Sequence, residues 1–472
     1  MNADVVRVCE AVREAGGRAM LVGGSVRDTL LGLESKDFDI EVYGLEPARL
    51  RTLLEQIGNV NTVGEHFSVY KLVFHRPPPR SATPDPSPED QNARIERVEI
   101  DVSLPRRESK SGRGHRGFVI EGDPAMSFAE AARRRDFTIN AIIYDPLTGE
   151  TIDPYGGRED LNRRVLKAVA LDTFVEDSLR VLRAIQLAAR FEMIIEPATQ
   201  SLCRSIGLSD LPRERIWGEI EKLLTLADRP SIGLAAALDL GVLDQLFPEI
   251  RALVGLQHDE DGDPPEDAFK HTGRAVDEAA RLTTFLSKPK RIAVMLATLC
   301  HDLAQSIGSA KIDAQEGDKS ALESTRAILN RLGLFVMGGY DVRMQVLALV
   351  REHRRPTDFY RRRQTIADGD FCRLAQQVDL DLLYRVAKAC AMGASGASSS
   401  VPEDWFIERA RSLGVEHGPP APLLQGRHLL NVGFEPGPQM GKLLQAVYEL
   451  QLDGEVATVE EALAAAQRLS DQ

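Results

Sequence analysis

Four short segments near the beginning of the chain are either continuously apolar or alternate between apolar and polar residues, which predicts strands. These segments are AMLVGG from Ala19, KDFDIEVYG from Lys36, FSVYKLVF from Phe67 and IERVEIDVS from Ile95. Helical spacing predicts helices over 5–15 and 47–56, and GGSVRDTLLG is predicted to be a tight turn that opens a helix. Together these elements predict a small α/β head with a mixed sheet.

From Leu161 onward the strand pattern fades, and apolar residues recur at three- and four-residue spacing, as in amphipathic helices. Such segments include DSLRVLRAIQLAARF, IWGEIEKLLTLA, RIAVMLATLCHDLA, ALESTRAILNRLG and VATVEEALAAAQRL. No repeat of solenoid period is evident. The pattern therefore predicts an α+β fold in which a mixed-sheet head precedes a long all-helical part.

Two segments have the composition of loops. RPPPRSATPDPSPEDQN, from Arg76 to Asn92, lacks large apolar residues that could pack and is predicted to be disordered. GASGASSSVPED, from Gly393, is predicted to separate the last part of the chain from the helices before it. Whether the first of these loops touches RNA stays open.

The composition is that of a soluble globular protein: of 472 residues, 43% are hydrophobic and 27% are charged. This length suffices for two to four domains. No run approaches the ~20 apolar residues of a membrane span, and the first residues lack the apolar region of a secretory signal. Five scattered cysteines without a CxxC pair predict reduced thiols in a cytoplasmic protein.

The net charge of −13 argues mildly against nucleic acid as a partner, because Lys and Arg drive phosphate binding. The net charge can mislead, however, when basic residues are concentrated in a few segments. Basic clusters occur at Arg106–Arg116, Arg133–Arg135, Arg351–Arg355 and Arg361–Arg363. A solvated face explains any single cluster, so composition leaves RNA binding open.

Asp37 and Asp39 stand two positions apart in a predicted strand, so both carboxylates lie on one face and Phe38 lies on the other. Two adjacent carboxylates repel each other, and a hard cation such as Mg²⁺ makes this arrangement favourable. Because such pairs are common on strand surfaces, the surrounding segments decide what this pair means.

The turn before this strand supplies such a context. Gly23 and Gly24 let the backbone approach a ligand, Ser25 offers a hydroxyl, and the helix N-terminus presents N–H groups suited to phosphate. An ordinary strand-to-helix turn, with Asp28 in the first helical turn, is the alternative. Turn and carboxylates together predict a site for a nucleoside triphosphate with Mg²⁺ and in-line displacement at phosphorus.

LVGGSVRDTLLG followed by KDFDIEV resembles the signature of the class II tRNA nucleotidyltransferase and poly(A) polymerase family, within the polymerase-β-like superfamily. Further segments resemble motifs of this family in the expected order: RRRDFTINAIIYD, the hinge motif DPYGGREDL, EDSLRVLRAIQLAARF and LPRERIWGEIEKLL. They extend to Leu224 nearly without gaps. The resemblance implies a polymerase-β-like head and template-independent addition of C and A to the 3′ end of tRNA from CTP and ATP.

The resemblance also implies site residues. Asp37 and Asp39 would hold two Mg²⁺ ions, and Arg134, Arg135 and Asp136 would help to hold the ribose of the incoming nucleotide. The full set of implied nucleotide-binding residues is Gly23, Gly24, Ser25, Arg27, Arg134, Arg135, Asp136, Asp177, Arg180 and Arg183.

Asp177 and Arg180 are three positions apart on a predicted helix and would therefore share one face. A carboxylate accepts from an exocyclic amino group and a guanidinium donates to a ring nitrogen, so such a pair can select cytosine and adenine over uracil and guanine. The resemblance implies this use, with Arg183 as a further candidate. A plain intrahelical ion pair is the alternative.

The superfamily implies a third carboxylate near the metals. Asp101 in VEIDVSLPR is the candidate, and Glu99 on the same strand face is the alternative. The polar face of an edge strand would show the same alternation, so the sequence does not decide between them.

KHTGRAVDEAA and ATLCHDLAQ resemble an HD phosphohydrolase domain, as in the body of some bacterial members of the family. His271, His301, Asp302 and His353 match its metal-ligand positions in type, and such donors suit a second divalent metal. The pattern is degenerate: Leu303-Ala304-Gln305 replaces the expected xGK, Asp318 stands in place of a histidine, and Cys390 stands in place of an aspartate. A structural relic and residual phosphohydrolase activity both stay open.

The predicted division is a head over residues 1–160, a helical neck with base- and RNA-binding helices over 161–255, an HD-like body over 256–400 and a helical tail over 401–472. A poly(A) polymerase, or an enzyme that adds only C or only A, would share all these motifs. An HD-type phosphohydrolase and a non-catalytic RNA-binding protein are alternatives of other classes. The oligomeric state is not predicted.

Overall fold

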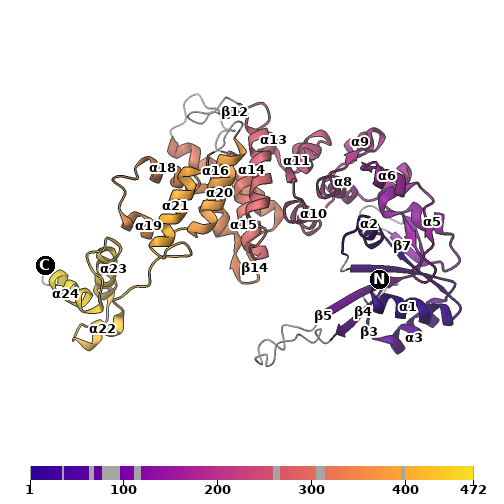
Figure 1. Cartoon of the computed structure of the whole chain (residues 1–472), viewed down its shortest axis with the longest axis horizontal. Coiled ribbons are helices and arrows are strands. Elements are labelled where there is room, and N and C mark those ends of the chain that lie inside the picture. Colours follow the sequence, from indigo (N-terminus) through magenta and orange to yellow (C-terminus); the bar gives the residue numbers. More distant parts are fainter. Residues whose placement is uncertain are drawn as a thin grey trace. The chain divides into compact units, whose positions relative to one another are not determined.

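The computed structural model describes residues 2–34, 37–62, 69–76, 96–110, 118–258, 266–303, 314–394 and 399–470. The chain divides into two compact units, Met1–Leu211 and Pro212–Gln472 (Figure 1). The finer division at residues 160, 255 and 400 stays a prediction. Among the helices that the structure describes, none has the length and apolar character to cross a membrane.

A mixed sheet of seven strands forms the centre of the first unit, in the order β3-β4-β5-β2-β1-β8-β9. Its strands are β1 (Arg18–Val22), β2 (Asp37–Tyr43), β3 (Asn59–Thr62), β4 (Val69–Arg76), β5 (Glu96–Ser103), β8 (Ile143–Tyr144) and β9 (Thr151–Ile152). Strands β2 and β5 are parallel, and the other paired neighbours are antiparallel. The four predicted strands are confirmed as β1, β2, β4 and β5.

Helices and smaller strand pairs complete this unit. The helices are α1 (Ala3–Glu14), α2 (Gly24–Leu30), α3 (Pro47–Ile57), α5 (Phe128–Arg133), the 3-10 helix η1 (Thr138–Asn140), α6 (Gly157–Asn162), α7 (Leu171–Phe174), α8 (Leu179–Arg190) and α9 (Pro197–Arg204). The strand pairs are β6 (Arg106–Lys110) with β7 (Phe118–Gly122), and β10 (Val165–Leu166) with β11 (Ile194–Ile195).

Apolar cores lie on both faces of the sheet. On one face, α1 and α3 pack on Ile40 and Val42 of β2. On the other face, Ala131 and Ala132 of α5 pack with Tyr43. Because side chains alternate along a strand, the acidic residues of β2 lie on the same face as α5.

The second unit is almost entirely helical, as predicted. Its helices are α10 (Arg213–Leu226), α11 (Pro230–Asp239), α12 (Val242–Leu246), α13 (Pro248–Arg251), α14 (Ala268–Leu282), α15 (Lys288–Cys300), α16 (Ala314–Leu332), α17 (Val342–Glu352), α18 (Arg355–Arg361), α19 (Asp368–Ala375), α20 (Leu380–Gly393), α21 (Val401–Ser412), α22 (Gly426–Asn431), α23 (Pro438–Leu452) and α24 (Val459–Ser470). Its short strands are β12 (Gln257–His258), β13 (Glu266–Asp267), β14 (Val336–Met337) and β15 (Tyr340–Asp341).

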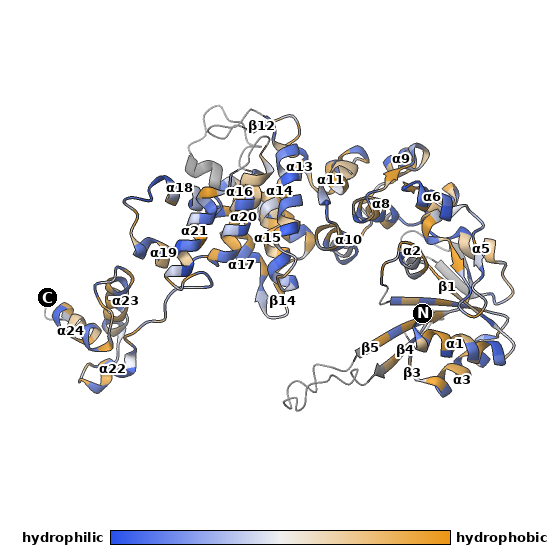
Figure 2. Cartoon of the chain, in the orientation of Figure 1, coloured by the Kyte–Doolittle hydropathy of each residue, from blue (hydrophilic) through white to orange (hydrophobic). Residues whose placement is uncertain are grey.

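Within this unit, α14 packs against both α15 and α20, and Figure 2 shows apolar and polar residues alternating around these helices. Helix α21 packs on α18 and α20, and Phe406 lies 5.8 Å from Phe359 between ring centroids. Helices α22 to α24 enclose a small core of their own around Leu429 and Val447. Most of the first predicted loop, and residues 395–398 of the second, lie outside the described residues.

Candidate active site

Four carboxylates share one face of the sheet where β2 and β5 run side by side. The parallel register places Asp39 opposite Asp101 and Asp37 opposite Glu99. Residues opposite each other in a sheet present their side chains to the same face. Phe38 points the other way and packs against the core that α1 and α3 cover. The register therefore joins the predicted carboxylate pair to both candidates for the third carboxylate.

The surroundings of these two candidates differ. Lys71 donates to Glu99 at 2.9 Å, whereas its nitrogen lies 3.8 Å from Asp101 Oδ1. That Asp101 oxygen is buried, and no hydrogen bond reaches it within the part of the chain that the structure describes. A buried acceptor of this kind suits a cation. The geometry favours Asp101 over Glu99 as the third carboxylate.

The electrostatics of Asp39 also indicate that this cluster of carboxylates suits a cation. Protein atoms around its carboxyl displace water and raise its pKa; the charge of Arg135 opposes this rise, and the charges of Asp101 and Asp37 add to it. A carboxylate cluster that is disfavoured in its ionised form is stabilised by a divalent cation. The residues present therefore fit a divalent metal.

Gly23 forms the predicted turn and borders the carboxylates directly. Its φ of +75° lies in the left-handed region, which favours glycine. A Cβ atom at Gly23 would lie 3.2 Å from both Arg135 Nη1 and Asp39 Oδ2. The turn thus brings the backbone, a guanidinium group that can bind phosphate and a carboxylate that can bind a metal ion together.

Two other residues of the turn are engaged elsewhere. Ser25 donates its hydroxyl to the Val22 carbonyl at 3.1 Å. Arg27 is 4% exposed, donates to Asp28 and to Asn140 Oδ1 at 2.7 Å, and lies 4.4 Å from the centre of the Phe191 ring. Gly24 packs against the Arg27 guanidinium. These contacts give Ser25 and Arg27 a packing role; direct nucleotide contact by either stays a prediction.

Arg134, Arg135 and Asp136 form the RRD segment, and its two arginines converge on Glu41, which was not among the predicted site residues. Arg134 and Arg135 follow α5, and each donates an Nη2 hydrogen to Glu41 Oε1, at 3.0 and 3.1 Å. Glu41 is buried in β2. The signal was present, because Glu41 continues the alternation of Asp37 and Asp39 along one strand face.

Asp136 is turned into the protein. It accepts from Arg183 Nε at 2.6 Å, from Asn140 at 3.0 Å and from the Phe137 N–H at 2.8 Å. Burial alone would raise the pKa of Asp136, but the charge of Arg183 and these hydrogen bonds lower it to about 2. The Asp136–Arg183 pair therefore fastens the RRD segment to α8.

The expectation that Asp177 and Arg180 share one face of a helix is wrong in its geometry. Helix α8 begins at Leu179, so Asp177 precedes it and accepts from the Leu179 N–H at 3.2 Å. Arg180 donates to the carbonyls of Thr173 at 2.8 Å and Arg134 at 2.5 Å. The Asp177 side chain accepts from the backbone N–H two residues ahead, a local bond by which Asp favours positions just before a helix. Hydrophobic periodicity alone does not predict such a bond.

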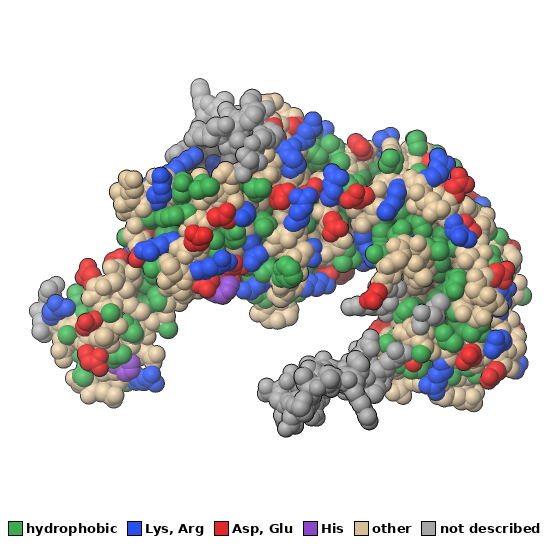
Figure 3. All heavy atoms as spheres, viewed as in Figure 1, with side chains coloured by type: hydrophobic (Ala, Val, Ile, Leu, Met, Phe, Trp, Pro, Cys, Tyr) green, Lys and Arg blue, Asp and Glu red, His purple; other side chains and the backbone are tan. Residues whose placement is uncertain are grey.

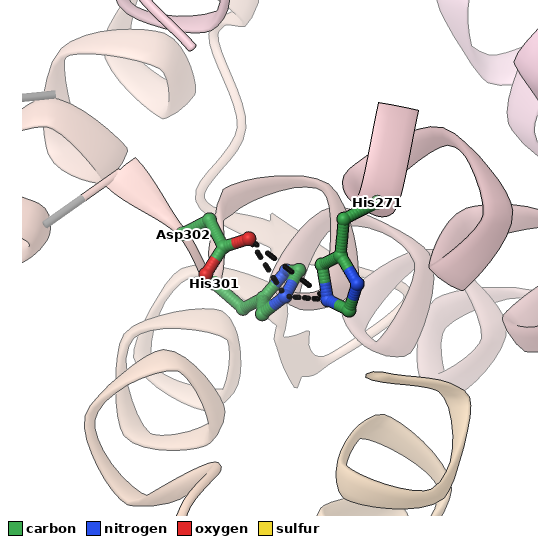
Figure 4. A group of neighbouring side chains, drawn as sticks. All are labelled: His271, His301 and Asp302. Atoms are coloured by element: carbon green, nitrogen blue, oxygen red, sulfur yellow. Dashed lines mark hydrogen bonds and ion pairs between the residues drawn. The ribbon is translucent and has the colours of Figure 1, made fainter. Parts of the chain in front are cut away.

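The second unit brings together His271, His301 and Asp302, three of the four predicted HD residues (Figure 4). One potential ligand atom from each lies within 4.8 Å of the others. The Nε2 atoms of His271 and His301 are 3.2 Å apart, and Asp302 Oδ2 lies 3.3 Å from His301 Nε2 and 3.9 Å from His271 Nε2. All three residues are buried.

The other ring nitrogens face fixed acceptors. His301 Nδ1 lies 2.7 Å from the Thr298 carbonyl, and His271 Nδ1 lies 3.2 Å from Glu266 Oε1. Acceptors of this kind hold the proton on Nδ1 and leave Nε2 as the ligand atom. Glu266 was not predicted, because its contact with His271 depends on the β12–β13 pair.

His353 lies at the edge of this group, with its ring 5.6 Å from that of His301. Burial lowers the pKa of His353 to about 3, and the neighbouring His301 adds to this effect. Cys390 lies on α20, and the side chain of Asp318 lies outside the described residues.

The basic clusters of the second unit are partly neutralised. Arg351 and Arg355 both donate to Glu352, at 2.6 and 2.9 Å. Arg363 lies over the Tyr360 ring at 4.3 Å. Figure 3 shows acidic side chains interspersed with basic ones on the visible face of this unit. These clusters alone therefore do not define an RNA surface.

Comparison with known proteins agrees with this geometry. Residues 19–167 match the family model of the poly(A) polymerase head domain, and residues 192–253 match that of a probable RNA- and SrmB-binding site of polymerase A. The multifunctional CCA protein of Xanthomonas campestris pv. campestris strain B100 is 36% identical over 342 residues, which are 71% of this chain and 74% of that protein. That of Stenotrophomonas maltophilia strain K279a is 37% identical over 294 residues, 61% of this chain and 64% of that protein.

Solved structures share the fold at lower identity. A CCA-adding enzyme in complex with CTP has a TM-score of 0.64 at 18% identity and aligns with 100% of this chain and 97% of its own. The enzyme of Bacillus stearothermophilus in complex with CTP has a TM-score of 0.62 at 20% identity, over 100% and 99% of the two chains. Together with the sequence relatives, the α+β head and helical body place this chain in the family of CCA-adding tRNA nucleotidyltransferases with a head of the poly(A) polymerase type.

Proposed function

We propose that this chain completes or repairs the 3′-CCA end of tRNA by adding nucleotides from CTP and ATP without a template. The observation that carries the proposal is the parallel register of β2 and β5, which pairs Asp39 with Asp101 beside Gly23 and Arg135. The names of the relatives and of the solved complexes support the same activity.

Asp37, Asp39 and Asp101 would hold Mg²⁺, whose charge, when bound, stabilises the attacking and leaving oxygens. Arg134 and Arg135 would meet the phosphate and ribose oxygens of the nucleotide, since guanidinium groups present forked donors. The absence of a side chain at Gly23 lets the backbone of the turn lie close to Arg135 and Asp39. In this arrangement, binding and orientation by the chain's own residues set the geometry of transfer.

Asp177 and Arg180 would select the base. Arg180 donates to the Arg134 carbonyl, so the segment that would read the base is tied to the segment that would hold the ribose. Cytosine and adenine present an amino group beside a ring acceptor, which an Asp–Arg pair matches. The neck would supply this pair and further RNA contacts, and we place the enzyme in the cytoplasm.

The test is incorporation of each labelled nucleoside triphosphate, with Mg²⁺, onto tRNA transcripts that lack three, two or one nucleotide of the CCA end. We expect CTP to be used on the first two transcripts and ATP on the third, with UTP and GTP unused. Use of ATP alone with open-ended products would indicate a poly(A) polymerase. Use of only one nucleotide on its own transcript would indicate a C-only or A-only enzyme.

We infer a second function for the HD-like group, a metal-dependent phosphohydrolase site. The observation that favours it is the convergence of His271 Nε2, His301 Nε2 and Asp302 Oδ2. Both Nδ1 atoms lie against acceptors, so the two Nε2 atoms and the Asp302 carboxylate converge on one position, as the ligands of a single metal ion do. This favours a working site over a structural relic.

The purified chain should therefore bind about one divalent transition metal per molecule at this group. Elemental analysis after incubation with Ni²⁺, Mn²⁺ or Co²⁺ and desalting measures the content. Asp302→Asn, which preserves the side-chain shape, should lose most of the metal and any phosphodiesterase activity, whereas the exposed His417→Ala should keep both. Equal metal content in Asp302→Asn and the unaltered chain would exclude this site.

A further inference from the structure

Glu41 is a buried acid in the middle of the candidate active site. It lies on β2, two positions beyond Asp39 and on the same strand face, and its side chain is 2% exposed. A buried carboxylate is costly unless charged partners and hydrogen bonds compensate for the lost water. Its partners therefore indicate why the fold keeps an acid there.

Three donors satisfy Glu41. Arg134 and Arg135 donate to Oε1, at 3.0 and 3.1 Å, and the Tyr43 hydroxyl donates to Oε2 at 3.0 Å. Two of these donors are guanidinium groups, so one carboxylate group holds two cations at once.

The two arginines are consecutive in the sequence, yet both donate to the same oxygen of Glu41. Like charges repel, and the long side chains of neighbours in an irregular segment have many accessible rotamers. A single oxygen of Glu41 holds both guanidinium groups, which remain 24% and 18% exposed. Each guanidinium has further N–H groups beyond the one that Glu41 accepts.

These guanidinium groups border the site at which the nucleotide would bind. Arg135 Nη1 lies 3.2 Å from the position of a Cβ on Gly23, and Asp39 Oδ2 lies at the same distance from that position. The backbone of Arg134 is held as well, because Arg180 donates to its carbonyl oxygen. Backbone and side chain of the RRD segment are therefore fixed by separate elements.

We propose that Glu41 is a positioning residue that holds Arg134 and Arg135 in the orientation in which they bind the phosphate and ribose oxygens of the incoming nucleotide. This inference rests on the proposed function of the site. Glu41 itself touches no substrate. Its contribution is preorganisation, which strengthens binding by removing rotamer freedom before the ligand arrives.

The test is the affinity for CTP and ATP with Mg²⁺, measured by calorimetry, in the full chain and in Glu41→Gln. Glutamine keeps the shape but loses the charge, and we expect an affinity about tenfold lower, a KM raised by the same factor and a kcat changed less than threefold. The KM for tRNA should not change. Glu41→Asp, which withdraws the charge by one methylene, should lie between.

Coupling to Arg134 and Arg135 separates positioning from a structural role. In an Arg134→Ala/Arg135→Ala background, Glu41→Gln should change CTP affinity less than twofold, because both groups through which Glu41 acts are gone. Glu403→Gln is the matched control: Glu403 is also buried, accepts from Thr357, and lies on α21 in the other unit. It should leave CTP affinity unchanged.

Unchanged CTP affinity in a folded Glu41→Gln chain, or full additivity of Glu41→Gln with the Arg134→Ala/Arg135→Ala double change, would overturn the role of Glu41. The proposed function fails separately, through an unaltered chain that binds CTP but transfers nothing to tRNA. An unaltered chain that binds neither CTP nor ATP would overturn both.

Discussion

Asp39→Asn should lower nucleotide transfer to tRNA by about 1000-fold or more, because a neutral amide is a poor ligand for the divalent metals that the carboxylate cluster suits. The variant should be as stable as the unaltered chain, because Asp39 is exposed and shares its strand face with Asp37 and Asp101, so the change removes like-charge repulsion. Single-turnover transfer rates and thermal unfolding of the same samples measure the two effects.

Asp101 and Glu99, which lie opposite Asp39 and Asp37, allow the two candidates for the third carboxylate to be compared. Asp101→Asn should lower transfer about 100-fold, whereas Glu99→Gln should lower it only a few-fold, because Lys71 already engages Glu99. If Glu99→Gln were the more damaging change, the third carboxylate would be Glu99. Wild-type transfer by Asp39→Asn would refute the metal assignment.

Gly157→Ala should destabilise the first unit by about 3 kcal/mol, roughly a 10 °C lower Tm for a unit of this size. A Cβ at Gly157 would lie 2.1 Å from the Thr138 carbonyl oxygen and 2.8 Å from Ile142 Cγ1, so α6 and η1 would have to separate. Transfer should fall as well, because Asn140 of η1 donates to Asp136. Thermal unfolding followed by circular dichroism measures the loss.

Gly218→Ala is the control for this change. Gly218 lies inside α10, and a Cβ there would meet no atom within 4 Å. Alanine in a helix interior is favoured over glycine by about 0.5–1 kcal/mol, so this variant should be as stable as the unaltered chain or more so. Equal losses in both variants would show that the contact between α6 and η1 does not limit stability.

Much of the architecture could be predicted because it follows from local pattern. Alternation along DFDIEVY identifies β2 and places Asp37 and Asp39 on one face, and the core on the other face confirms it. Strands β3, β8 and β9 could not be predicted, since two to four residues carry no period and form strands only through their partners.

The site residues show where local reasoning ends. Arg27 follows a phosphate-type turn, yet Asn140 and Phe191, both far away in the sequence, bury its guanidinium. Glu41 has the spacing of a ligand, but only the packing of α5 brings two arginines to it. Asp177 has helical spacing from Arg180 but precedes the helix. Each outcome depends on contacts between distant segments.

For the HD-like residues, the sequence correctly predicted that distant residues lie together. Their types and order predicted a common site, and His271, His301 and Asp302 do lie together. The degenerate pattern suggested a weakened site, whereas the Nδ1 contacts with Thr298 and Glu266 orient the ligand atoms. A carbonyl three residues before a histidine becomes a partner only through the local backbone conformation, which composition does not reveal.

Addition of CCA is tested most directly by the mass of the product formed when tRNA lacking its CCA end is incubated with this chain, Mg²⁺ and all four nucleoside triphosphates. We expect one product, extended by two C and one A, and no product when Asp39→Asn replaces the unaltered chain. Products of indefinite length, products containing U or G, or equal extension by both chains would contradict it.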